Sequence, residues 1–296
     1  MKSGTVSIVG RPNVGKSTLL NKILDKKIAI TSNKAQTTRN IILGVLNDDD
    51  SQIVFIDTPG IHKPKNKLGN LLNKKAWTMT NDVDLVLFMV DIDKGFGKGD
   101  QFILDKLKQE EAKVILILNK IDNANKLDLL KKIDELKELY DFLEIIPISA
   151  LKGLNVNDLI KTIKKYLPND FKYYDDSYVT NQPTSMIVTE RVREKILKLT
   201  NDEVPHSVTC MLETFNETPK LIELQVLIIV DRDNLKKIII GKNGQMLKEI
   251  GTEARLDLEE YFNKKVYLEL YVKTIKNWRD RANYINELGL KDDLDE

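Results

Sequence analysis

Short, continuously apolar runs recur through the first half of the chain, and amphipathic stretches separate them. Continuous runs such as VILIL predict strands that are buried on both faces. The candidate strands are Thr5–Val9, Ile53–Asp57, Leu85–Asp91, Lys113–Asn119 and Glu144–Ser149. The stretches with helical periodicity are Lys16–Leu24, Gly99–Gln109, Leu127–Tyr140 and Val156–Leu167, which Pro168 ends. This alternation predicts an α/β domain with a mainly parallel sheet over residues 1–168.

The second half of the chain has a different order of elements. Residues 169–183 are polar, acidic and rich in tyrosine, and we interpret them as a linker. The elements predicted after it are helix Ser185–Thr200, strands His206–Phe215 and Leu221–Val230, helices Arg232–Ile240 and Gln245–Phe262, and strand Lys264–Ile275. The order αββααβ predicts an α+β domain over residues 184–296, with helices on one face of a small sheet and a tail at its end.

Composition narrows the class of protein. The 296 residues are 42% hydrophobic and 31% charged, which supports packed cores and excludes intrinsic disorder. Residues 1–168 hold 27 basic and 21 acidic residues, and residues 169–296 hold 19 and 24, four of the acids in the tail Asp292–Glu296. The single cysteine, Cys210, agrees with a reducing, cytoplasmic location. Because the apolar runs are too short for a bilayer or a signal peptide, we expect neither an integral membrane protein nor a secreted one.

A phosphate-binding loop follows the first predicted strand. The segment GRPNVGKS at 10–17 fits G-x-x-x-x-G-K-[ST] and opens a predicted helix. Backbone amides at such a helix start close around phosphates, Lys16 would reach the β- and γ-phosphates, and the Ser17 hydroxyl would bind Mg²⁺. The residues that we assign to phosphate binding are Gly10, Asn13, Val14, Gly15, Lys16, Ser17 and Thr18.

A second motif and a polar loop complete the predicted phosphate and metal site. The motif is Asp57-Thr58-Pro59-Gly60, at the end of an apolar strand. Asp57 would hold Mg²⁺ and the Gly60 amide would sense the γ-phosphate, with Thr58 and Pro59 in the same loop. In the polar segment Thr31–Asn40, Thr38 is our choice for the threonine that closes onto Mg²⁺, with Thr37 as the alternative.

Two further motifs, each at the end of a predicted strand, are predicted to recognise the base of the nucleotide. Asn119-Lys120-Ile121-Asp122 follows one strand, and Ser149-Ala150-Leu151 follows the last one. The Asp122 carboxylate can accept two N–H bonds that guanine offers and adenine does not. Lys120 would lie along the base, Asn119 would join the base loop to the phosphate loop, and an amide of Ser149, Ala150 or Leu151 would contact guanine O6. The ordered motifs predict GTP/GDP with Mg²⁺ as the ligand.

Ile61 follows the second motif, where Ras-type switches place a glutamine that orients the attacking water. An isoleucine cannot do this, so we expect slow hydrolysis, with Lys16, Thr38 and Gly60 as the candidate catalytic residues. We interpret Arg11 and Arg39 as surface arginines. His62 is a conceivable base that we leave out of the catalytic set.

The second domain contains a GXXG loop, IIIGKNG at 238–244, between two predicted helices. In KH domains such a loop clamps about four single-stranded nucleotides. The residues that we assign to RNA binding are Lys236, Lys237, Gly241, Lys242, Asn243, Gly244 and Lys248. The basic segment around Trp278 would either extend this surface or be an ordinary helix whose Trp278 packs on the domain.

These motifs, together with QTTR at Gln36–Arg39, make the sequence resemble the Era family of bacterial GTPases over roughly residues 3–290. The resemblance implies a P-loop, Ras-like GTPase domain followed by a type II KH domain. It also implies binding of the 3′ region of 16S rRNA, a role in assembly of the small (30S) ribosomal subunit, and a peripheral contact with the inner membrane face. Potassium is a further candidate cofactor, with Asn13 as its indirect ligand.

We therefore expect a monomeric, slowly hydrolysing GTP switch that binds rRNA and not DNA. The alternative is a GTPase of RNA modification whose C-terminal domain binds a partner protein or tRNA. Against it, tRNA-modifying relatives end in a reactive cysteine motif, whereas this chain ends in DDLDE and holds only Cys210.

Overall fold

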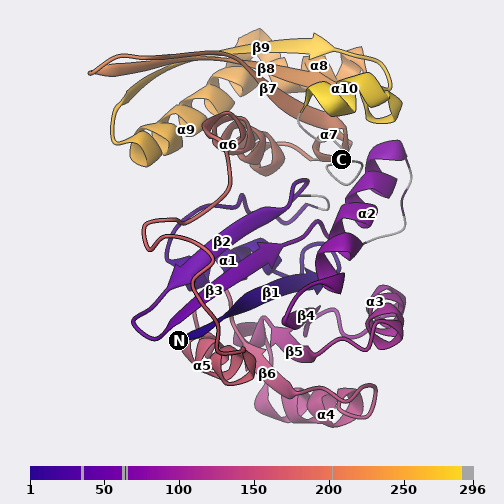
Figure 1. Ribbon diagram of the computed structural model, residues 1–296. Coiled ribbons are helices and arrows are strands. Elements are labelled where there is room, and N and C mark those ends of the chain that lie inside the picture. Colours follow the sequence, from indigo (N-terminus) through magenta and orange to yellow (C-terminus); the bar gives the residue numbers. More distant parts are fainter. Residues whose placement is uncertain (35–36, 62–63, 65, 202, 289–296) are drawn as a thin grey trace. The chain divides into compact units, whose positions relative to one another are not determined.

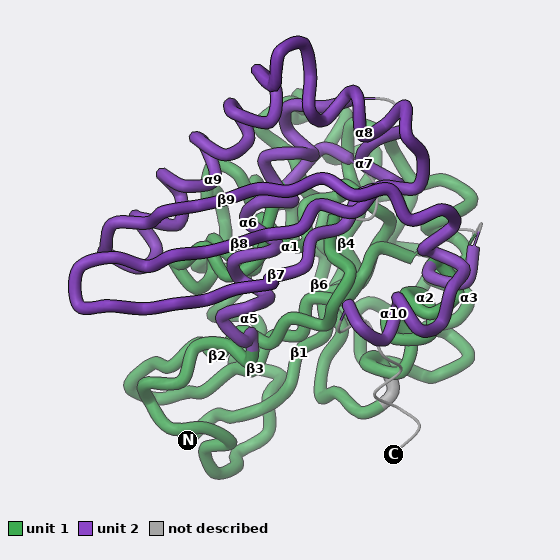
Figure 2. The backbone as a smooth tube through the Cα atoms, turned by 90° about the horizontal axis from the view of Figure 1, so that it is seen from above, with its two compact units in different colours: residues 1–31, 36–65, 69–181 green, residues 32–35, 66–68, 182–296 purple. Residues whose placement is uncertain are grey.

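The computed structural model describes residues 1–34, 37–61, 64, 66–201 and 203–288, which form two compact units. Unit 1 comprises residues 1–31, 36–65 and 69–181, and unit 2 comprises residues 32–35, 66–68 and 182–296 (Figure 2). Gln36, His62 and the acidic tail, which the sequence analysis singled out, lie outside the described residues. No helix in the described part of the chain is long and apolar enough to cross a membrane.

Unit 1 is built on a six-stranded sheet in the order β2-β3-β1-β4-β5-β6 (Figure 1). The strands are β1 (Lys2–Gly10), β2 (Ile42–Asn47), β3 (Ser51–Asp57), β4 (Leu85–Asp91), β5 (Val114–Asn119) and β6 (Glu144–Ile148). Every neighbouring pair is parallel except β2 and β3. The predicted parallel sheet is confirmed, and β4 keeps the predicted bounds because all seven of its residues are buried.

Helices cover the sheet of unit 1. They are α1 (Lys16–Leu24), α2 (Lys67–Asn81), α3 (Lys98–Gln109), α4 (Lys126–Leu136) and α5 (Val156–Tyr166). Apolar residues of α2, α3 and α4 share one core with those of β4 and β5, and α1 packs with α5. Helix α2 and the antiparallel strand β2 were not predicted from the sequence.

The segment that follows α5 lies along the open edge of this sheet. The Val45 amide of β2 donates to the Val179 carbonyl at 2.9 Å, and Gly44 forms a β-bridge with Thr180. On β3, the Gln52 side chain accepts from the amides of Tyr173 and Tyr174 at 2.7 and 3.0 Å. Part of the residues expected as a linker is therefore fastened to unit 1.

Unit 2 is a three-stranded sheet in the order β7-β8-β9, with helices packed against it (Figure 1). Its elements are α6 (Thr184–Leu199), α7 (Val204–Ser207), β7 (Val208–Glu217), β8 (Leu221–Val230), α8 (Asp233–Ile240), η2 (Lys242–Gly244), α9 (Gln245–Phe262), β9 (Lys265–Thr274), η3 (Trp278–Asp280) and α10 (Ala282–Glu287). The predicted order αββααβ is present, with the short α7 added before β7. Strands β7 and β8 are antiparallel, and β8 and β9 are parallel.

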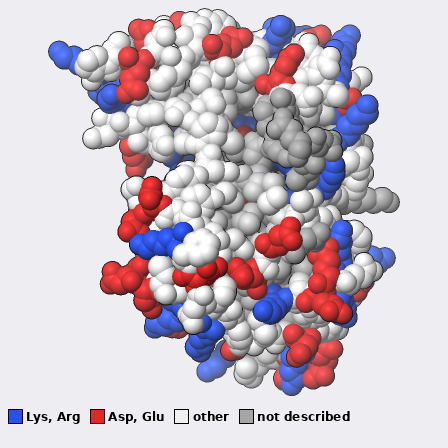
Figure 3. Space-filling model, in the orientation of Figure 1, with Lys and Arg blue, Asp and Glu red and all other residues white. Residues whose placement is uncertain are grey.

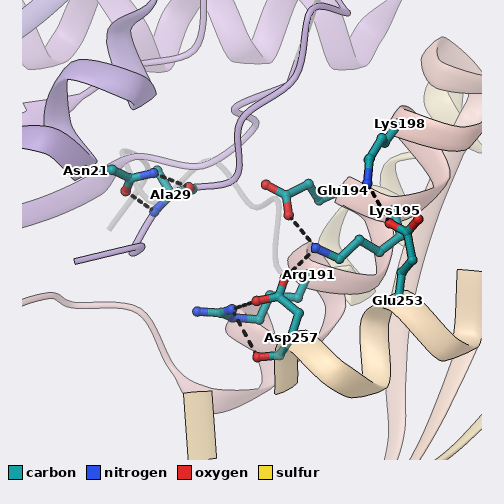
Figure 4. A network of polar contacts seen from close by, with 8 residues as sticks. All are labelled: Asn21, Ala29, Arg191, Glu194, Lys195, Lys198, Glu253 and Asp257. Atoms are coloured by element: carbon teal, nitrogen blue, oxygen red, sulfur yellow. Dashed lines mark hydrogen bonds and ion pairs between the residues drawn. The ribbon is translucent and has the colours of Figure 1, made fainter. Parts of the chain in front are cut away.

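Ionic contacts fasten α6 to α9 within unit 2 (Figure 4). Asp257 of α9 accepts from both Arg191 and Lys195, the second at 2.5 Å, and Lys195 also pairs with Glu194 at 2.9 Å. At the other end of the unit, Trp278 is fully buried and its indole N–H donates to the Ser207 carbonyl at 3.0 Å. Of the two interpretations of the segment around Trp278, the structure therefore supports packing on the domain.

Candidate nucleotide site and nucleic-acid interface

The four nucleotide motifs meet at one edge of the sheet of unit 1. They follow β1, β3, β5 and β6, and the parallel strands of a sheet present their carboxyl ends at the same edge. Ligands of open α/β sheets bind outside these carboxyl ends. The arrangement of the strands thus brings together segments that are far apart along the chain.

Asn119 joins three of these segments. Its side-chain amide donates to the Val14 carbonyl at 2.7 Å, and its side-chain oxygen accepts from the Ala150 amide at 2.9 Å. Gly15 has a φ of 107°, and a Cβ there would lie 2.3 Å from the Asn119 amide nitrogen. Glycine is therefore required at this point of the phosphate loop. The link between the phosphate and base loops lies where the sequence analysis placed it.

Lys16 lies across the phosphate loop. Its side chain is buried, and its ammonium donates to the carbonyls of Gly10 and Arg11 at 3.3 and 3.1 Å. Burial lowers the pKa of Lys16 to about 8, and the charge of Asp57 offsets part of this effect. The cation is held by weak neutral partners, which an anionic phosphate would replace.

Ser17, Thr38 and Asp57 converge on one point. The Ser17 hydroxyl donates to an Asp57 carboxylate oxygen at 2.6 Å and lies 2.8 Å from the Thr38 hydroxyl. The Thr38 hydroxyl lies 3.4 Å from the same carboxylate oxygen, and all three side chains are buried. Burial raises the pKa of Asp57, while Lys16, Ser17 and Thr38 oppose this shift.

This oxygen cluster fits Mg²⁺. The second carboxylate oxygen of Asp57 is buried and has no hydrogen-bond partner among the described residues. A buried carboxylate oxygen without a partner is unfavourable unless a cation offsets it. Magnesium commonly takes one or two carboxylates from the protein and completes its shell with water and substrate phosphates. One carboxylate beside two hydroxyls has this chemistry.

The rest of the second motif packs inward. The Thr58 hydroxyl donates to the Ile8 carbonyl at 2.9 Å, and Pro59 is buried. Gly60 lies against Pro12 of the phosphate loop, close enough that a Cβ there would approach Pro12 to 2.9 Å. Ile61 belongs to the core shared with α2, α3 and α4. Its side chain contributes to packing and offers nothing to orient water.

The base loop is more exposed. Lys120 has a φ of 73°, and its ammonium pairs with Asp91 at the end of β4, at 2.6 Å. Asp122 lies exposed in the short turn η1 (Ile121–Asn123), and Leu151 is 71% exposed. Ser149 is buried, and its hydroxyl accepts from the Lys152 amide at 3.1 Å. Asp91 was missed by the sequence analysis, although its position at the end of an apolar strand was a usable signal.

Neither nearby arginine is a simple surface residue. Arg39 is 2% exposed. Arg11 donates to the Gly95 carbonyl at 2.8 Å and pairs with the fully buried Asp100 at 2.8 Å. The interpretation of both as surface arginines was wrong. It failed because single positions in a loop give no periodicity from which burial could be predicted.

The GXXG loop of unit 2 is a tight turn between α8 and α9. Gly241 and Gly244 have φ of 71° and 75°, and a Cβ at Gly241 would lie 2.9 Å from the Met246 nitrogen. Lys242 and Asn243 lie between the glycines, within the short turn η2, and both are exposed. Lys237 is exposed, and Lys236 and Lys248 lie beside the same turn in α8 and α9. The lysines predicted to bind RNA thus flank one turn.

A groove runs from this turn between α9 and β9. Its volume is about 410 Å³, room for a nucleotide-sized group rather than a folded domain. The lining residues are Gly244, Leu247, Lys248, Gly251, Thr252, Arg255, Leu268 and Leu270. Of these residues, only Gly244 and Lys248 were predicted from the sequence. The signal was present, because positions 244, 248, 251 and 255 lie on one helical face.

Together, the fold and these two sites define a GTPase domain joined to a KH domain. A family model described as 50S ribosome-binding GTPase matches residues 5–120, and a KH domain model matches residues 203–279. A crystal structure of a single-residue variant of Aquifex aeolicus Era bound to GDP.AlF4⁻ is 43% identical to the chain and covers 98% of it, with 99% of that chain covered and a TM-score of 0.95. A structure of Era with MgGDPNP and nucleotides 1506–1542 of 16S ribosomal RNA matches with the same values. The chain belongs to the Era family of GTPases.

Proposed function

We propose that the protein is a Mg²⁺-dependent GTPase switch that binds the 3′ region of 16S rRNA during assembly of the small ribosomal subunit. One observation supports the switch. Thr38, from the polar segment after α1, contacts Ser17 and Asp57 in the oxygen cluster that fits Mg²⁺. The RNA target is supported by the solved complex of the 43% identical Era with nucleotides 1506–1542. We further propose that residues 1–168 bind the nucleotide and residues 184–296 bind the RNA, on either side of 169–183.

The geometry of the site supports the following nucleotide roles. Lys16 and the amides of the phosphate loop, from Gly10 to Thr18, would hold the phosphates at the start of α1. Ser17, Thr38 and Asp57 would hold Mg²⁺, which supplies positive charge to the phosphate oxygens. The Gly60 amide would respond to the γ-phosphate, so that loss of this phosphate releases the loops around Thr38 and Gly60. Asp122 would read the guanine edge, while Lys120 and the 149–151 loop border the base.

The RNA role rests on local rather than overall charge. In the view of Figure 3, basic and acidic side chains are interspersed, without one large field. The turn from Gly241 to Gly244 allows close approach of a nucleic-acid backbone, with Lys236, Lys237 and Lys248 beside it. The apolar side chains of Leu268 and Leu270 are part of the lining of the groove, where a base would lose water contact.

Several finer points complete the proposal. Because Ile61 is buried in the core, another cation would have to offset charge during hydrolysis. We propose K⁺, with Asn13 as its indirect ligand, and expect hydrolysis to fall when Na⁺ replaces K⁺ at equal ionic strength. We also propose a cytoplasmic monomer that works on the 30S subunit, does not bind DNA, and makes a peripheral contact with the inner membrane face.

The test is equilibrium binding of an RNA with the sequence of nucleotides 1506–1542, in the presence of GDPNP and of GDP. Lys242→Glu reverses one charge in the GXXG turn and should weaken binding about tenfold or more. Lys220→Glu is the matched control, because Lys220 is an exposed lysine in the turn between β7 and β8. It should leave binding within about twofold of the wild type.

The outcomes separate the parts of the proposal. Tighter binding with GDPNP, together with an effect of Lys242→Glu alone, supports the switch. Equal binding in both nucleotide states retains the RNA role and removes the coupling. Absence of binding in both states would contradict the RNA role and leave the GTPase as the supported function.

A further inference from the structure

Arg11 points away from the phosphate loop that contains it. Its guanidinium donates to the Gly95 carbonyl at 2.8 Å, and its Nε lies 2.8 Å from the carboxylate of Asp100. Both partners belong to the connection from β4 to α3 and the first turn of α3. The arginine is therefore committed to a neighbouring segment, and its charge is not directed at the phosphate-binding side of the loop.

Asp100 is a buried carboxylate that needs a cationic partner, and Arg11 supplies it. Its side chain is fully buried, and the same carboxylate oxygen accepts from the Gly97 amide at 2.9 Å, which caps the start of α3. Burial raises the pKa of Asp100, and the Gly97 amide and Arg11 oppose this shift. A buried carboxylate that loses its cationic partner is strongly unfavourable. Asp100 and Arg11 thus depend on one another.

Gly99 makes room for the contact. A Cβ at Gly99 would lie 2.8 Å from the Cδ of Arg11, which is closer than carbon atoms approach without a shift. Glycine in a helix is otherwise unfavourable relative to alanine by up to about 1 kcal/mol. Its presence here is explained by the passage of the arginine side chain across the helix start.

The same connection also holds the base loop. Asp91 pairs with Lys120 at 2.6 Å, Asp93 accepts from the Asn123 side chain at 2.9 Å, and the Ile92 amide donates to the Asn119 carbonyl at 3.0 Å. Asn119 in turn donates to Val14 of the phosphate loop. The phosphate loop, the β4–α3 connection and the base loop therefore form a closed ring of contacts, and Arg11 closes it.

We propose that Arg11 and Asp100 are positioning residues that brace the phosphate loop against α3 and thereby slow nucleotide dissociation. The inference rests on the proposed guanine-nucleotide function. It assigns to the β4–α3 connection, which carries none of the nucleotide motifs, control over how long the nucleotide stays bound. The brace acts on the loop and not on the charge that develops during phosphate cleavage.

The experiment measures dissociation of a fluorescent GDP from the full chain carrying Arg11→Gln, Asp100→Asn or both. Each single variant should dissociate about tenfold faster, and the double variant no faster than the singles, because the two residues form one contact. The control is Lys106→Gln with Glu110→Gln, which removes an ion pair of 3.8 Å between α3 and the residue that follows it. Its dissociation rate should equal that of the wild type.

Gly99→Ala distinguishes positioning from loss of folding. The added methyl group displaces Arg11 and leaves the buried Asp100 without its partner, so some loss of thermal stability is expected. Dissociation should accelerate at a temperature where circular dichroism shows the variant to be fully folded. Cleavage of already bound GTP by Gly99→Ala, followed in a single turnover, should remain within about twofold of the wild type.

Three results would overturn the inference. Multiplicative effects in the double variant would show that Arg11 and Asp100 act independently. Unchanged dissociation in Arg11→Gln and Gly99→Ala would show that the brace does not hold the nucleotide. Slower cleavage in Arg11→Gln with unchanged dissociation would assign Arg11 to charge stabilisation instead. A wild-type chain that binds no guanine nucleotide would overturn the proposed function as well, so the two failures are distinguishable.

Discussion

The nucleotide site and the GXXG groove, which is the groove between α9 and β9, differ in the kind of residue that forms them. At the nucleotide site, Lys16, Ser17, Thr38 and Asp57 are all buried and each has polar partners at short distance. In the groove, glycines and leucines form the lining together with Lys248, Thr252 and Arg255. Buried polar groups need defined partners, so the first site fixes residue identities. The second site depends mainly on the shape of its backbone.

Asp122→Asn should produce the largest effect. It tests whether residue identity is as important at this exposed position of the nucleotide site as at the buried ones. Replacing the carboxylate removes two charge-assisted hydrogen bonds to guanine, worth about 3 kcal/mol or more in total, so GDP affinity should fall by about a hundredfold or more. Calorimetry with GDP and with IDP, which lacks the 2-amino group, checks this. The wild type should prefer GDP and the variant should lose that preference. An unchanged ratio of the two affinities would mean that Asp122 does not face the base edge.

Gly251→Ala tests whether the groove works through shape. A Cβ at Gly251 would lie 3.4 Å from a methyl carbon of Leu270, an ordinary contact. Alanine in the interior of α9 should stabilise unit 2 by about 1 kcal/mol, while the added methyl narrows the groove. We expect higher thermal stability together with a marked loss of RNA affinity. If RNA affinity keeps its wild-type value in the stabilised variant, the groove beside Gly251 is not part of the RNA surface.

The smallest expected effect concerns a half-buried charge, Glu269 on β9. Hydrogen bonds from Tyr267, Tyr271 and Gln225 lower the pKa of Glu269 below its usual 4.5. Because the folded-state pKa is lowered, these bonds stabilise the fold above pH 4.5, and the contribution is lost as pH falls through the folded-state pKa. Tyr267→Phe with Tyr271→Phe should raise the pKa of Glu269 towards 4.5, measured by a carboxyl NMR titration. Tyr261→Phe on α9 should leave it unchanged, and an equal shift there would exclude these hydrogen bonds as the cause.

The same contrast explains which parts of the structure were predictable. The strands of unit 1 were found because burial on both faces requires continuous apolar runs, and β4 is the clearest case. Helix α2 was missed because only Leu68, Leu72 and Ala76 mark its buried stripe among polar residues. Thr38, which lies beside Asp57, was chosen from its residue type and its position in the polar loop after α1. The contact of Arg11 with Asp100 was not, because no spacing along the chain connects a loop residue to a distant helix start.

Strand β2 is the outermost strand of its sheet, and the residues around Thr180 pair with it. An unpaired outer strand is a template for association with other chains. A fragment of the protein cut at Pro168 would present that strand, together with the side chain of Gln52, to solvent, whereas one cut after Asn181 would keep both covered. By covering this strand, the tyrosine-rich segment protects the sheet edge from self-association. Any isolated nucleotide-binding fragment should therefore retain it.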